Sequence, residues 1–360
     1  MASIKNLKNL KNFWSNKKVF ITGHTGFKGS WLSIILNSLN SEIHGYSLKP
    51  QKNSLYNKSK IEKKISSSTY ANINDRIKLK NTFFSCQPEI IFHLAAQPLV
   101  LESYIKPFET FNTNISGTLN LLECIREFNF IKSVVIITTD KVYKIDKKNK
   151  SYKETDELGG LDPYSSSKVG VEILVNSYIE SYFRNSNLKN KISTARAGNV
   201  IGGGDFSDNR LLPDIINSIN KGTNLVVRNS NHIRPWQHVL DPLMGYLTLA
   251  EKQYKNKITV NEHSWNFGPN KNSFKKVIDI VKYVKRLKNF KYTLKKNNKF
   301  KETNILKLNS IKAKNNLKWI SKWNLNQSLE NTIDWNSGTK NGTSSKNMCE
   351  RQFLMYINKK

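Results

Sequence analysis

The stretch TGHTGFKG, residues 22–29, decides how the first part of this chain folds. Gly23, Gly26 and Gly29 follow one another at intervals of three, directly after the β-rich run Lys18–Thr22 and before an apolar, helix-like segment. Glycine permits a tight turn and lets the backbone approach a pyrophosphate, while the N-terminus of the next helix faces the phosphate charge. We therefore predict a nucleotide site at this strand–turn–helix junction, with an ordinary tight turn as the alternative.

Strand-like and helix-like segments alternate outward from this turn to about residue 198. The run SVVIITT at 133–139 is β-branched and bounded by polar residues, as is typical of a buried parallel strand. Strands separated by helices of 11 to 21 residues indicate βαβ units. The expected strands are 18–22, 43–46, 89–94, 133–139 and 192–197, and the expected helices are 29–39, 108–128 and 164–183. The fold class predicted is α/β, with a doubly wound (Rossmann) parallel sheet and a smaller C-terminal domain.

The pattern changes after residue 198, where glycine-rich and polar stretches begin. We expect a Rossmann domain over 1–198, with 235–262 returning to it, and a substrate-binding domain over 199–234 and 263–360. Within the second domain, 271–288 is predicted as one basic amphipathic helix. The Gly/Ser/Thr/Asn-rich segment 336–346 is predicted as a flexible connection.

The net charge of this 360-residue chain is +31, from 58 basic and 27 acidic residues. A nucleic-acid binder would use such a charge to displace counterions from phosphates. Lysine is nevertheless spread over the whole chain, and asparagine, which adds no charge, is also in excess. A lysine- and asparagine-rich coding bias explains both excesses, and no nucleic-acid-reading motif is present. We therefore expect no specific nucleic-acid partner.

Cysteine spacing and hydropathy indicate in which cellular compartment the protein is expected. Cys86, Cys124 and Cys349 are widely spaced and odd in number, which favours neither a disulfide framework nor a zinc site. The six histidines show no metal-ligand spacing, so no metal is assigned. No apolar run approaches the roughly 18 residues of a membrane helix. The expectation is a cytoplasmic protein without a membrane partner.

Two further motifs carry chemistry. Tyr164 and Lys168 form a YxxxK pair, whose spacing places both side chains on one face of a predicted helix. A lysine cation near a tyrosine is expected to lower the tyrosine pKa, which would make Tyr164 a base for a sugar hydroxyl. Thr138-Thr139-Asp140-Lys141 ends the buried strand at 133–139, and in open α/β sheets this end faces the ligand crevice. Solvated surface groups are the alternative for each motif.

Together these motifs resemble the extended short-chain dehydrogenase/reductase family and, within it, the branch of CDP-glucose 4,6-dehydratases. The resemblance covers most of the chain in order, and TTDK and RPWQHVLDP are specific to this branch. It is carried by Phe13-Trp14, TGHTGFKGSWL (22–32), HGYSL (44–48), HLAAQPLV (93–100), NTNISGTLNLLE (112–123), TTDKVY (138–143), PYSSSK (163–168), RAGNVIGGGDFSDNRLLPD (196–214) and RPWQHVLDPL (234–243).

The resemblance implies roles for individual positions. Thr139, Asp140, Lys141, Tyr164 and Lys168 would be catalytic. NAD would be bound by Gly23, Thr25, Gly26, Phe27, Gly29, Asn72, Ile73, Leu94, Ala95, Ala96, Gln97, Asn114, Thr138, Tyr164 and Lys168. The sugar nucleotide would be bound by Ser103, Asn199, Arg210, Leu211, Arg234 and His238. Arginine suits a diphosphate because its planar fork binds two oxygens at once.

Two departures from the family pattern concern the cofactor. The end of the second strand, Tyr46-Ser47-Leu48-Lys49, lacks the acid that usually reads the adenosine ribose, so from spacing alone NADP is tenable. The same run occurs in the NAD-using branch, and we therefore expect NAD. Asn72 stands where the family has aspartate, and its amide oxygen can still accept a hydrogen bond, so weaker rather than lost binding is expected.

The implied activity is a hydro-lyase reaction that converts CDP-glucose to CDP-4-keto-6-deoxyglucose in deoxysugar and O-antigen synthesis. Asp140 is expected to be the acid that protonates the leaving hydroxyl. Lys141, which stands where dTDP-glucose dehydratases have a glutamate, is expected to be the base. The alternatives are an epimerase or decarboxylase of the same family, which would not need the Asp–Lys pair, and a basic protein without enzymatic activity. A homodimer is expected through the helices at 108–128 and 164–183.

Overall fold

A computed structural model of the chain describes residues 2–145, 150–258, 263–295 and 306–359. Its centre is a sheet of seven parallel strands in the order β11-β6-β5-β4-β1-β2-β3. The strands are β1 (Lys18–Thr22), β2 (Glu42–Ser47), β3 (Ser67–Tyr70), β4 (Ile90–His93), β5 (Ser133–Ile137), β6 (Ile192–Ala197) and β11 (Ser264–Phe267). The strand order reverses between β1 and β4, as in a Rossmann fold, so the predicted fold class is confirmed.

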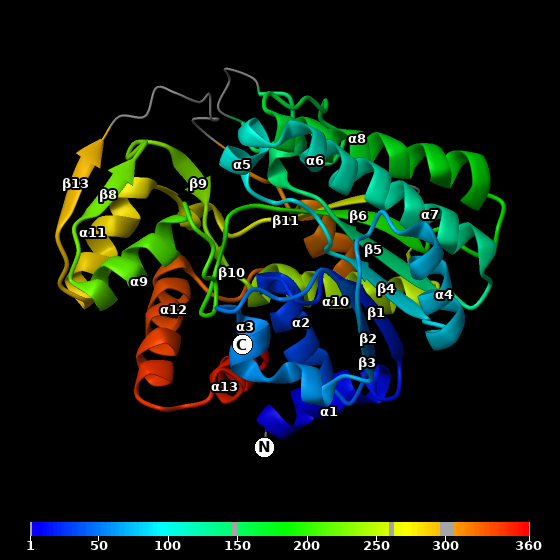
Figure 1. Ribbon diagram of the computed structural model, residues 1–360, viewed down its shortest axis with the longest axis horizontal. Coiled ribbons are helices and arrows are strands. Elements are labelled where there is room, and N and C mark those ends of the chain that lie inside the picture. The colour runs from blue at the N-terminus through cyan, green and yellow to red at the C-terminus, as the bar shows by residue number, and fades with distance from the viewer. Residues whose placement is uncertain (1, 146–149, 259–262, 296–305, 360) are drawn as a thin grey trace.

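Helices cover both faces of the sheet, as Figure 1 shows. On one face lie α4 (Arg76–Cys86), α7 (Gly117–Glu127) and α8 (Pro163–Tyr178), which share a core with β4 and β5. On the other lie α1 (Ala2–Trp14), α2 (Phe27–Ser38), α10 (Leu240–Tyr254) and α13 (Ser345–Asn358). All five residues of β5 are buried, which explains why its sequence is uniformly apolar rather than alternating.

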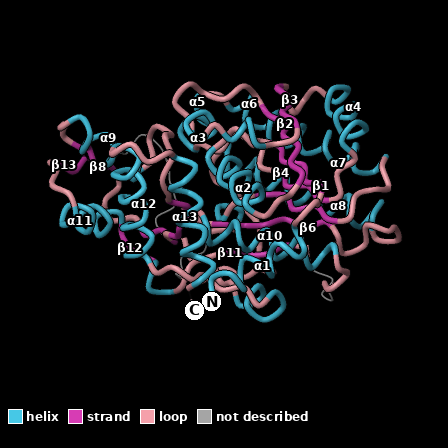
Figure 2. The backbone as a smooth tube through the Cα atoms, turned by 90° about the horizontal axis from the view of Figure 1, so that it is seen from below, coloured by secondary structure: helices cyan, strands magenta, loops and turns pink. Residues whose placement is uncertain are grey.

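The helix predicted over 108–128 is continuous in the structure but has three parts. α6 (Pro107–Phe111) leads through a π-helical turn, η2 (Asn112–Ser116), into α7. The remaining short elements around the sheet are α3 (Leu55–Ser59), α5 (Val100–Ile105), β7 (Val200–Ile201) and β10 (Gln237–His238). Figure 2 shows these elements from below; α3 packs against α2 and α13, whereas α5 packs against α6 and α8.

A smaller lobe lies to the left in Figure 1 and has its own apolar core. It contains α9 (Leu211–Lys221), β8 (Leu225–Arg228), β9 (Ile233–Pro235), β12 (Phe274–Lys276), α11 (Val277–Leu287), β13 (Tyr292–Lys295) and most of α12 (Leu325–Lys340). The helix predicted over 271–288 was therefore placed too early, because 274–276 pair with β9 as a strand. The lysine-heavy stretch 291–301 predicts a strand and a turn; 292–295 form β13, and 296–301 lie outside the described residues.

The connection predicted over 336–346 is corrected as well. α12 continues to Lys340 and α13 starts at Ser345, so the actual turn is short. Asn324 caps α12 with a reciprocal capping box, and packing of Leu329, Ile333 and Trp335 holds the polar helix in place. Tertiary packing overrides a weak local propensity here.

The expected domain boundary at 262/263 does not match the sheet. β11 pairs with β6 from Ser264 to Phe267 and is thus the seventh strand of the Rossmann domain. α13 packs on α1 and α2 of the Rossmann domain as well as on α12. α10 shares an apolar core with α1 and α2 on one face of the sheet. Among the described residues, no helix combines the length and the apolarity that crossing a membrane requires.

Candidate active site

A cavity of about 790 Å³ lies at the carboxyl ends of the strands and extends toward the smaller lobe. This volume is in the upper part of the range of about 300–1,000 Å³ for ligand sites. The cavity occupies the point where the strand order reverses, which is the usual ligand crevice of open α/β sheets. It brings together residues from the glycine-rich turn, the end of β5, α8 and the smaller lobe.

The glycine-rich turn forms one wall of the cavity. Gly23 has a φ of +73°, and a Cβ there would lie 2.7 Å from the backbone nitrogen of Ala95. A Cβ on Gly29 would lie 2.2 Å from the carbonyl oxygen of Gly23. Gly26 is exposed and precedes the first turn of α2. The turn thus leaves the N-terminus of α2 open to an anionic group, which fits the pyrophosphate of a dinucleotide.

Most residues expected at the cofactor line this cavity. They are Gly23, Thr25, Gly26, Phe27, Gly29, Asn72, Ile73, Leu94, Ala95, Ala96 and Thr138. Thr25 is also bonded to Ser47, across 2.8 Å between the two hydroxyl oxygens, at the end of β2. This contact holds the glycine-rich turn against the end of β2, where no acidic residue is present to bind the adenosine ribose.

Gln97 and Asn114 lie behind the wall instead of on it. The Asn114 oxygen accepts a 2.8 Å hydrogen bond from the Gln97 backbone nitrogen, and its amide nitrogen donates to Ser167. The Gln97 amide nitrogen donates to Thr110 at 2.9 Å. Their polar atoms are engaged in joining the β4 loop to α8, so this geometry favours a supporting role over direct contact with a cofactor.

Tyr164 and Lys168 both line the cavity from α8. Pro163 starts the helix and Asp162 caps it with a capping box, while Ser103 accepts a 3.1 Å hydrogen bond from the Tyr164 backbone nitrogen. The Lys168 ammonium donates to the carbonyl oxygen of Ile137 at 3.1 Å. Helix capping and the strand end therefore fix both side chains.

The charge states of this pair differ from the expectation. Burial raises the Tyr164 pKa to about 12, although a hydrogen bond with Thr139 opposes the rise. Burial and the nearby Lys28 lower the Lys168 pKa to about 8, against the attraction of Glu172. The Tyr164 pKa of the protein alone is thus raised where a lowering was expected, because desolvation outweighs the Thr139 hydrogen bond and the charge of Arg210.

Asp140 is buried beside this pair. Its Oδ1 accepts a 3.1 Å hydrogen bond from the Thr139 hydroxyl. Its buried Oδ2 has no hydrogen-bond partner within the parts of the chain that the structure describes. Burial raises the Asp140 pKa, although Lys141, Thr139 and Arg234 act against the rise. A carboxyl group whose protonated form is favoured by burial and which has one unengaged oxygen is suited to be an acid.

Four of the six residues expected at the substrate line the cavity: Asn199, Arg210, Leu211 and Arg234. Arg210 forms a 3.0 Å ion pair with buried Asp205 and stays one-third exposed. Arg234 is buried and donates to the Ile233 carbonyl oxygen at 3.1 Å. Lys141 is half-buried and also faces the cavity. Cationic groups therefore reach the cavity both from the smaller lobe and from the end of β5.

Ser103 and His238 do not line the cavity. Ser103 is fully buried and is used at the start of α8. His238 is packed between Trp31 and Trp323, and burial lowers its pKa to about 3. The structure thus favours packing for His238 over the expected substrate contact.

Lys28 is a cavity residue that the motif analysis did not single out. It lies in the first turn of α2, and burial and the charge of Arg210 lower its pKa to about 8. The sequence shows that Lys28 lies in the glycine motif. That its side chain points into the cavity depends on the geometry of the turn. Among the described residues, no group of histidine, cysteine or carboxylate side chains could hold a metal ion.

The junction of the lobes is fixed at Gly203. The Trp31 indole of α2 donates a 2.9 Å hydrogen bond to the Gly203 carbonyl oxygen. A Cβ on Gly203 would lie 2.0 Å from the ring of Trp335 in α12. The loop that carries Arg210 thus begins at Gly203, which the two tryptophans hold in place.

The parallel sheet, the glycine-rich turn and the Tyr–Lys pair at the crevice define an extended short-chain dehydrogenase/reductase. The family model described as GDP-mannose 4,6 dehydratase matches residues 20–332. The chain belongs to this family of nucleotide-sugar dehydratases, as the sequence predicted.

Two curated proteins and one solved structure illustrate the similarity. The chain is 39% identical over 353 residues to CDP-glucose 4,6-dehydratase of Salmonella typhimurium (strain LT2), covering 96% of this chain and 98% of that protein. It is 31% identical over 214 residues to dTDP-D-glucose 4,6-dehydratase of Dictyostelium discoideum, covering 56% and 48%. The dTDP-glucose 4,6-dehydratase of Bacillus anthracis in complex with NAD superposes with a TM-score of 0.77 at 22% identity, covering 92% and 99%.

Proposed function

We propose that this chain is a hydro-lyase that removes water from CDP-glucose to give CDP-4-keto-6-deoxyglucose. The observation that carries the proposal is the presence of Asp140 and Lys141 in the same cavity as Tyr164 and Lys168. Oxidation at C4 needs only the second pair, whereas loss of the C6 hydroxyl also needs an acid and a base. The full-length similarity to a CDP-glucose 4,6-dehydratase supports this substrate.

NAD is the cofactor that we propose. The open N-terminus of α2 and the glycine backbone fit its pyrophosphate, and the similar Bacillus anthracis fold was solved with NAD. When bound, NAD would take a hydride from C4 of the sugar and later return it to C6. The protein must hold the sugar and move the protons.

Tyr164 is proposed as the base that takes the C4 hydroxyl proton. Its high pKa in the protein alone means that it must be favoured as a phenolate by positive charge, which Lys168 supplies from the same helix face. Thr139 is within hydrogen-bonding contact of the Tyr164 hydroxyl and orients it.

Asp140 and Lys141 are proposed for the elimination. Once C4 is a ketone, the C5 proton is acidic because the ketone accepts the negative charge as an enolate. Lys141 would remove the C5 proton, and Asp140 would give its proton to the departing C6 hydroxyl, which leaves as water. The protonated Lys141 would then return a proton to C5 as the hydride reaches C6, and the proton that Tyr164 took from the C4 hydroxyl would restore the acid. The raised Asp140 pKa keeps that proton available.

Arg210 and Arg234 are proposed to bind the diphosphate of the substrate, since both face the cavity beside Asn199. The test is incubation with CDP-, UDP-, GDP- and dTDP-hexoses, followed by mass analysis of each product. CDP-glucose should give a product lighter by one water. An unchanged mass would overturn the dehydratase proposal and favour an epimerase.

Self-association is proposed through α6, α7 and α8. Phe108, Leu119 and Ile173 are exposed on these neighbouring helices, and Tyr182 is exposed on the π-helical turn η4 (Ile179–Phe183) that continues α8. These side chains offer an apolar surface suited to a second copy of the chain. Light scattering should give the mass of a dimer for the parent chain. Phe108→Glu should give a monomer, and an unchanged mass would place the contact elsewhere.

The product is proposed to supply a deoxysugar for surface polysaccharide such as lipopolysaccharide. We place the reaction in the cytoplasm, because Cys86, Cys124 and Cys349 are free thiols. Deletion in the source organism should remove the deoxysugar from its polysaccharide. Fractionation should recover the protein with cytoplasmic enzymes.

A further inference from the structure

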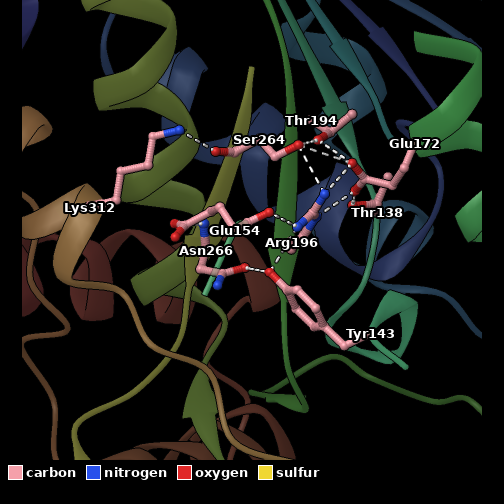
Figure 3. A network of polar contacts seen from close by, with 9 residues as sticks. All are labelled: Thr138, Tyr143, Glu154, Glu172, Thr194, Arg196, Ser264, Asn266 and Lys312. Carbon is pink, nitrogen blue, oxygen red and sulfur yellow. Dashed lines mark hydrogen bonds and ion pairs between the residues drawn. The ribbon is translucent and has the colours of Figure 1, made fainter. Parts of the chain in front are cut away.

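A buried carboxylate, Glu172, lies on α8 one helical turn after Lys168. Figure 3 shows the polar network around it. Its Oε1 accepts hydrogen bonds from the Thr138 hydroxyl at 2.5 Å and from Arg196 Nε at 2.9 Å. Its Oε2 accepts from Thr194 at 2.7 Å and from Arg196 Nη2 at 2.8 Å. Oε2 also accepts from the Ser264 hydroxyl of β11 at 3.2 Å, so the carboxylate is bonded by donors from β6, β11 and the residue that follows β5.

Arg196 is the cation of this pair, and only 3% of its side chain is exposed. Besides Glu172, it donates to the Tyr143 hydroxyl at 2.8 Å and to the Ser264 hydroxyl at 2.9 Å. Burial alone would raise the Glu172 pKa, but Arg196 and the two threonine hydroxyls hold that pKa below its usual value. These contacts therefore favour the negatively charged form of Glu172 inside the protein.

This charge is joined to the catalytic groups on two sides. Thr138 directly precedes Thr139, Asp140 and Lys141, and its hydroxyl is engaged by Glu172. Lys168 donates to Ile137, the last residue of β5. Lys168 and Glu172, one turn apart on α8, are thus bonded to the successive residues Ile137 and Thr138 at the end of β5. The Thr138 side chain is held by this network, although the residue was expected at the cofactor.

We propose that Glu172, held by Arg196, is a positioning residue that keeps Lys168 charged and keeps the end of β5 in register with α8. It touches neither cofactor nor substrate, because it lies behind Lys168 and away from the cavity lining. Nothing in the glycine, YxxxK or TTDK motifs assigns it a role. The inference deepens the proposed function, on which its kinetic consequence rests.

The titratable groups coupled to Lys168 come from three elements. Lys28, in α2, opposes its positive charge, and Glu172, in α8, favours it. His93, in β4, is acted on by Lys168, and burial and that charge lower the His93 pKa to about 3, so the ring is neutral. Glu172 is therefore the anion that offsets Lys28 and the cost of burial at Lys168.

The test measures the titration of Lys168 without substrate or cofactor. Lysine labelled with ¹³C at Cε reports its own charge by NMR, and the Lys168 signal is identified by its loss in Lys168→Met. In the parent chain this lysine should titrate near pH 8. In Glu172→Gln the midpoint should fall by about 1 pH unit, the lower end of the effect of a nearby opposite charge. An unchanged midpoint overturns the proposal.

A double variant separates charge from folding. Glu172→Gln leaves the Arg196 guanidinium buried without its partner, so this variant should melt at a lower temperature. Glu172→Gln with Arg196→Met removes both charges and should recover part of the melting temperature, while the lowered Lys168 midpoint persists. If the double variant restores the parent midpoint, the pair is merely structural and the proposal fails. Where the single variant does not fold, the double variant carries the test.

Glu180→Gln is the matched control. Glu180 lies further along the same helical segment and forms an exposed pair with Arg184. This variant should keep both the midpoint and the melting temperature, and an equal shift there would contradict a specific role for Glu172.

Turnover of CDP-glucose adds a kinetic readout. The alkaline limb of the kcat/KM profile should move to lower pH in Glu172→Gln by the same amount as the NMR midpoint. Absence of turnover in the parent chain would count against the proposed function and leave the NMR result to decide the role of Glu172. A profile unchanged while the parent is active would overturn the positioning role.

Discussion

The Thr139 hydroxyl donates a 3.1 Å hydrogen bond to the Asp140 carboxyl group and is also in hydrogen-bonding contact with Tyr164. One hydroxyl therefore connects the group proposed for oxidation with the group proposed for elimination. A change at either end should be visible at a different step of the reaction, which makes the two halves separable by mutation.

Lys141→Met should stop the reaction after oxidation. Without a base at C5, the 4-keto sugar and reduced nicotinamide should accumulate on the enzyme, and turnover should fall by about 10² to 10⁴-fold. Absorbance of the reduced nicotinamide during a single turnover measures this. Exchange of solvent deuterium into C5 at the parent rate would show that another residue is the base.

Tyr164→Phe should act earlier, because the proton of the C4 hydroxyl then has no acceptor. Reduced nicotinamide should not accumulate, and the oxidation rate should fall by about 10² to 10⁴-fold. The same single-turnover absorbance trace distinguishes this variant from Lys141→Met. Accumulation at the parent rate would remove Tyr164 from the oxidation step.

Gly29→Ala should weaken NAD binding by at least tenfold. A methyl group there would lie 2.2 Å from the Gly23 carbonyl oxygen, so the turn would have to open. Gly222→Ala is the control, since Gly222 ends α9 with nothing within 4 Å of its Cβ position. Its φ of +66° should cost about 1 kcal/mol of stability without affecting NAD titrated by calorimetry. Equal NAD affinity in both variants would show that the close packing of the glycine-rich turn is not needed for NAD binding.

Much of the fold and the site could be predicted because the signals are local. The glycine turn, the apolar run of β5 and the helix carrying Tyr164 and Lys168 each lie within a short segment. β11 was not recognised, because four residues, Ser264–Phe267, carry too little pattern to reveal a distant partner strand. The Tyr164 pKa was also misjudged, since sequence spacing shows which charges are near but not how much water is excluded.

The position of Glu172 is a sequence signal for a charged partner of Lys168. It follows Lys168 by four residues on a predicted helix, so a carboxylate on the same face could have been noticed. Its partner Arg196 lies 24 residues further along the chain, in strand β6. Their pairing depends on β6 lying next to β5 in the sheet.

Asp241 should make stability depend on pH. Burial raises its pKa to about 6, so the folded protein keeps a proton there that the unfolded chain releases near pH 4. Between these values the folded state binds more protons, and the free energy of unfolding should fall as pH rises, by about 3 kcal/mol in all. Urea melts at several pH values test this. Asp241→Asn should show a flatter dependence over pH 4–6, and an equal slope would contradict the assignment.

Binding to nucleic acid should be non-specific and sensitive to salt. If the net charge of +31 reflects composition alone, binding to a random DNA duplex at 20 mM salt should disappear near 150 mM. Fluorescence anisotropy across a salt series measures this. Sequence-specific binding that persists near 150 mM would indicate that the charge has a partner.

The contacts of Gly203 bear on how substrate choice could change during evolution. Any side chain at this position would collide with Trp335, while Trp31 already holds its carbonyl oxygen. Saturation mutagenesis should therefore accept almost nothing at Gly203. New sugar-nucleotide preferences would have to arise from the cavity-lining side chains beyond it, between Asp205 and Trp236. The molecule thus joins a position closed to variation to a neighbouring segment that remains free to diversify.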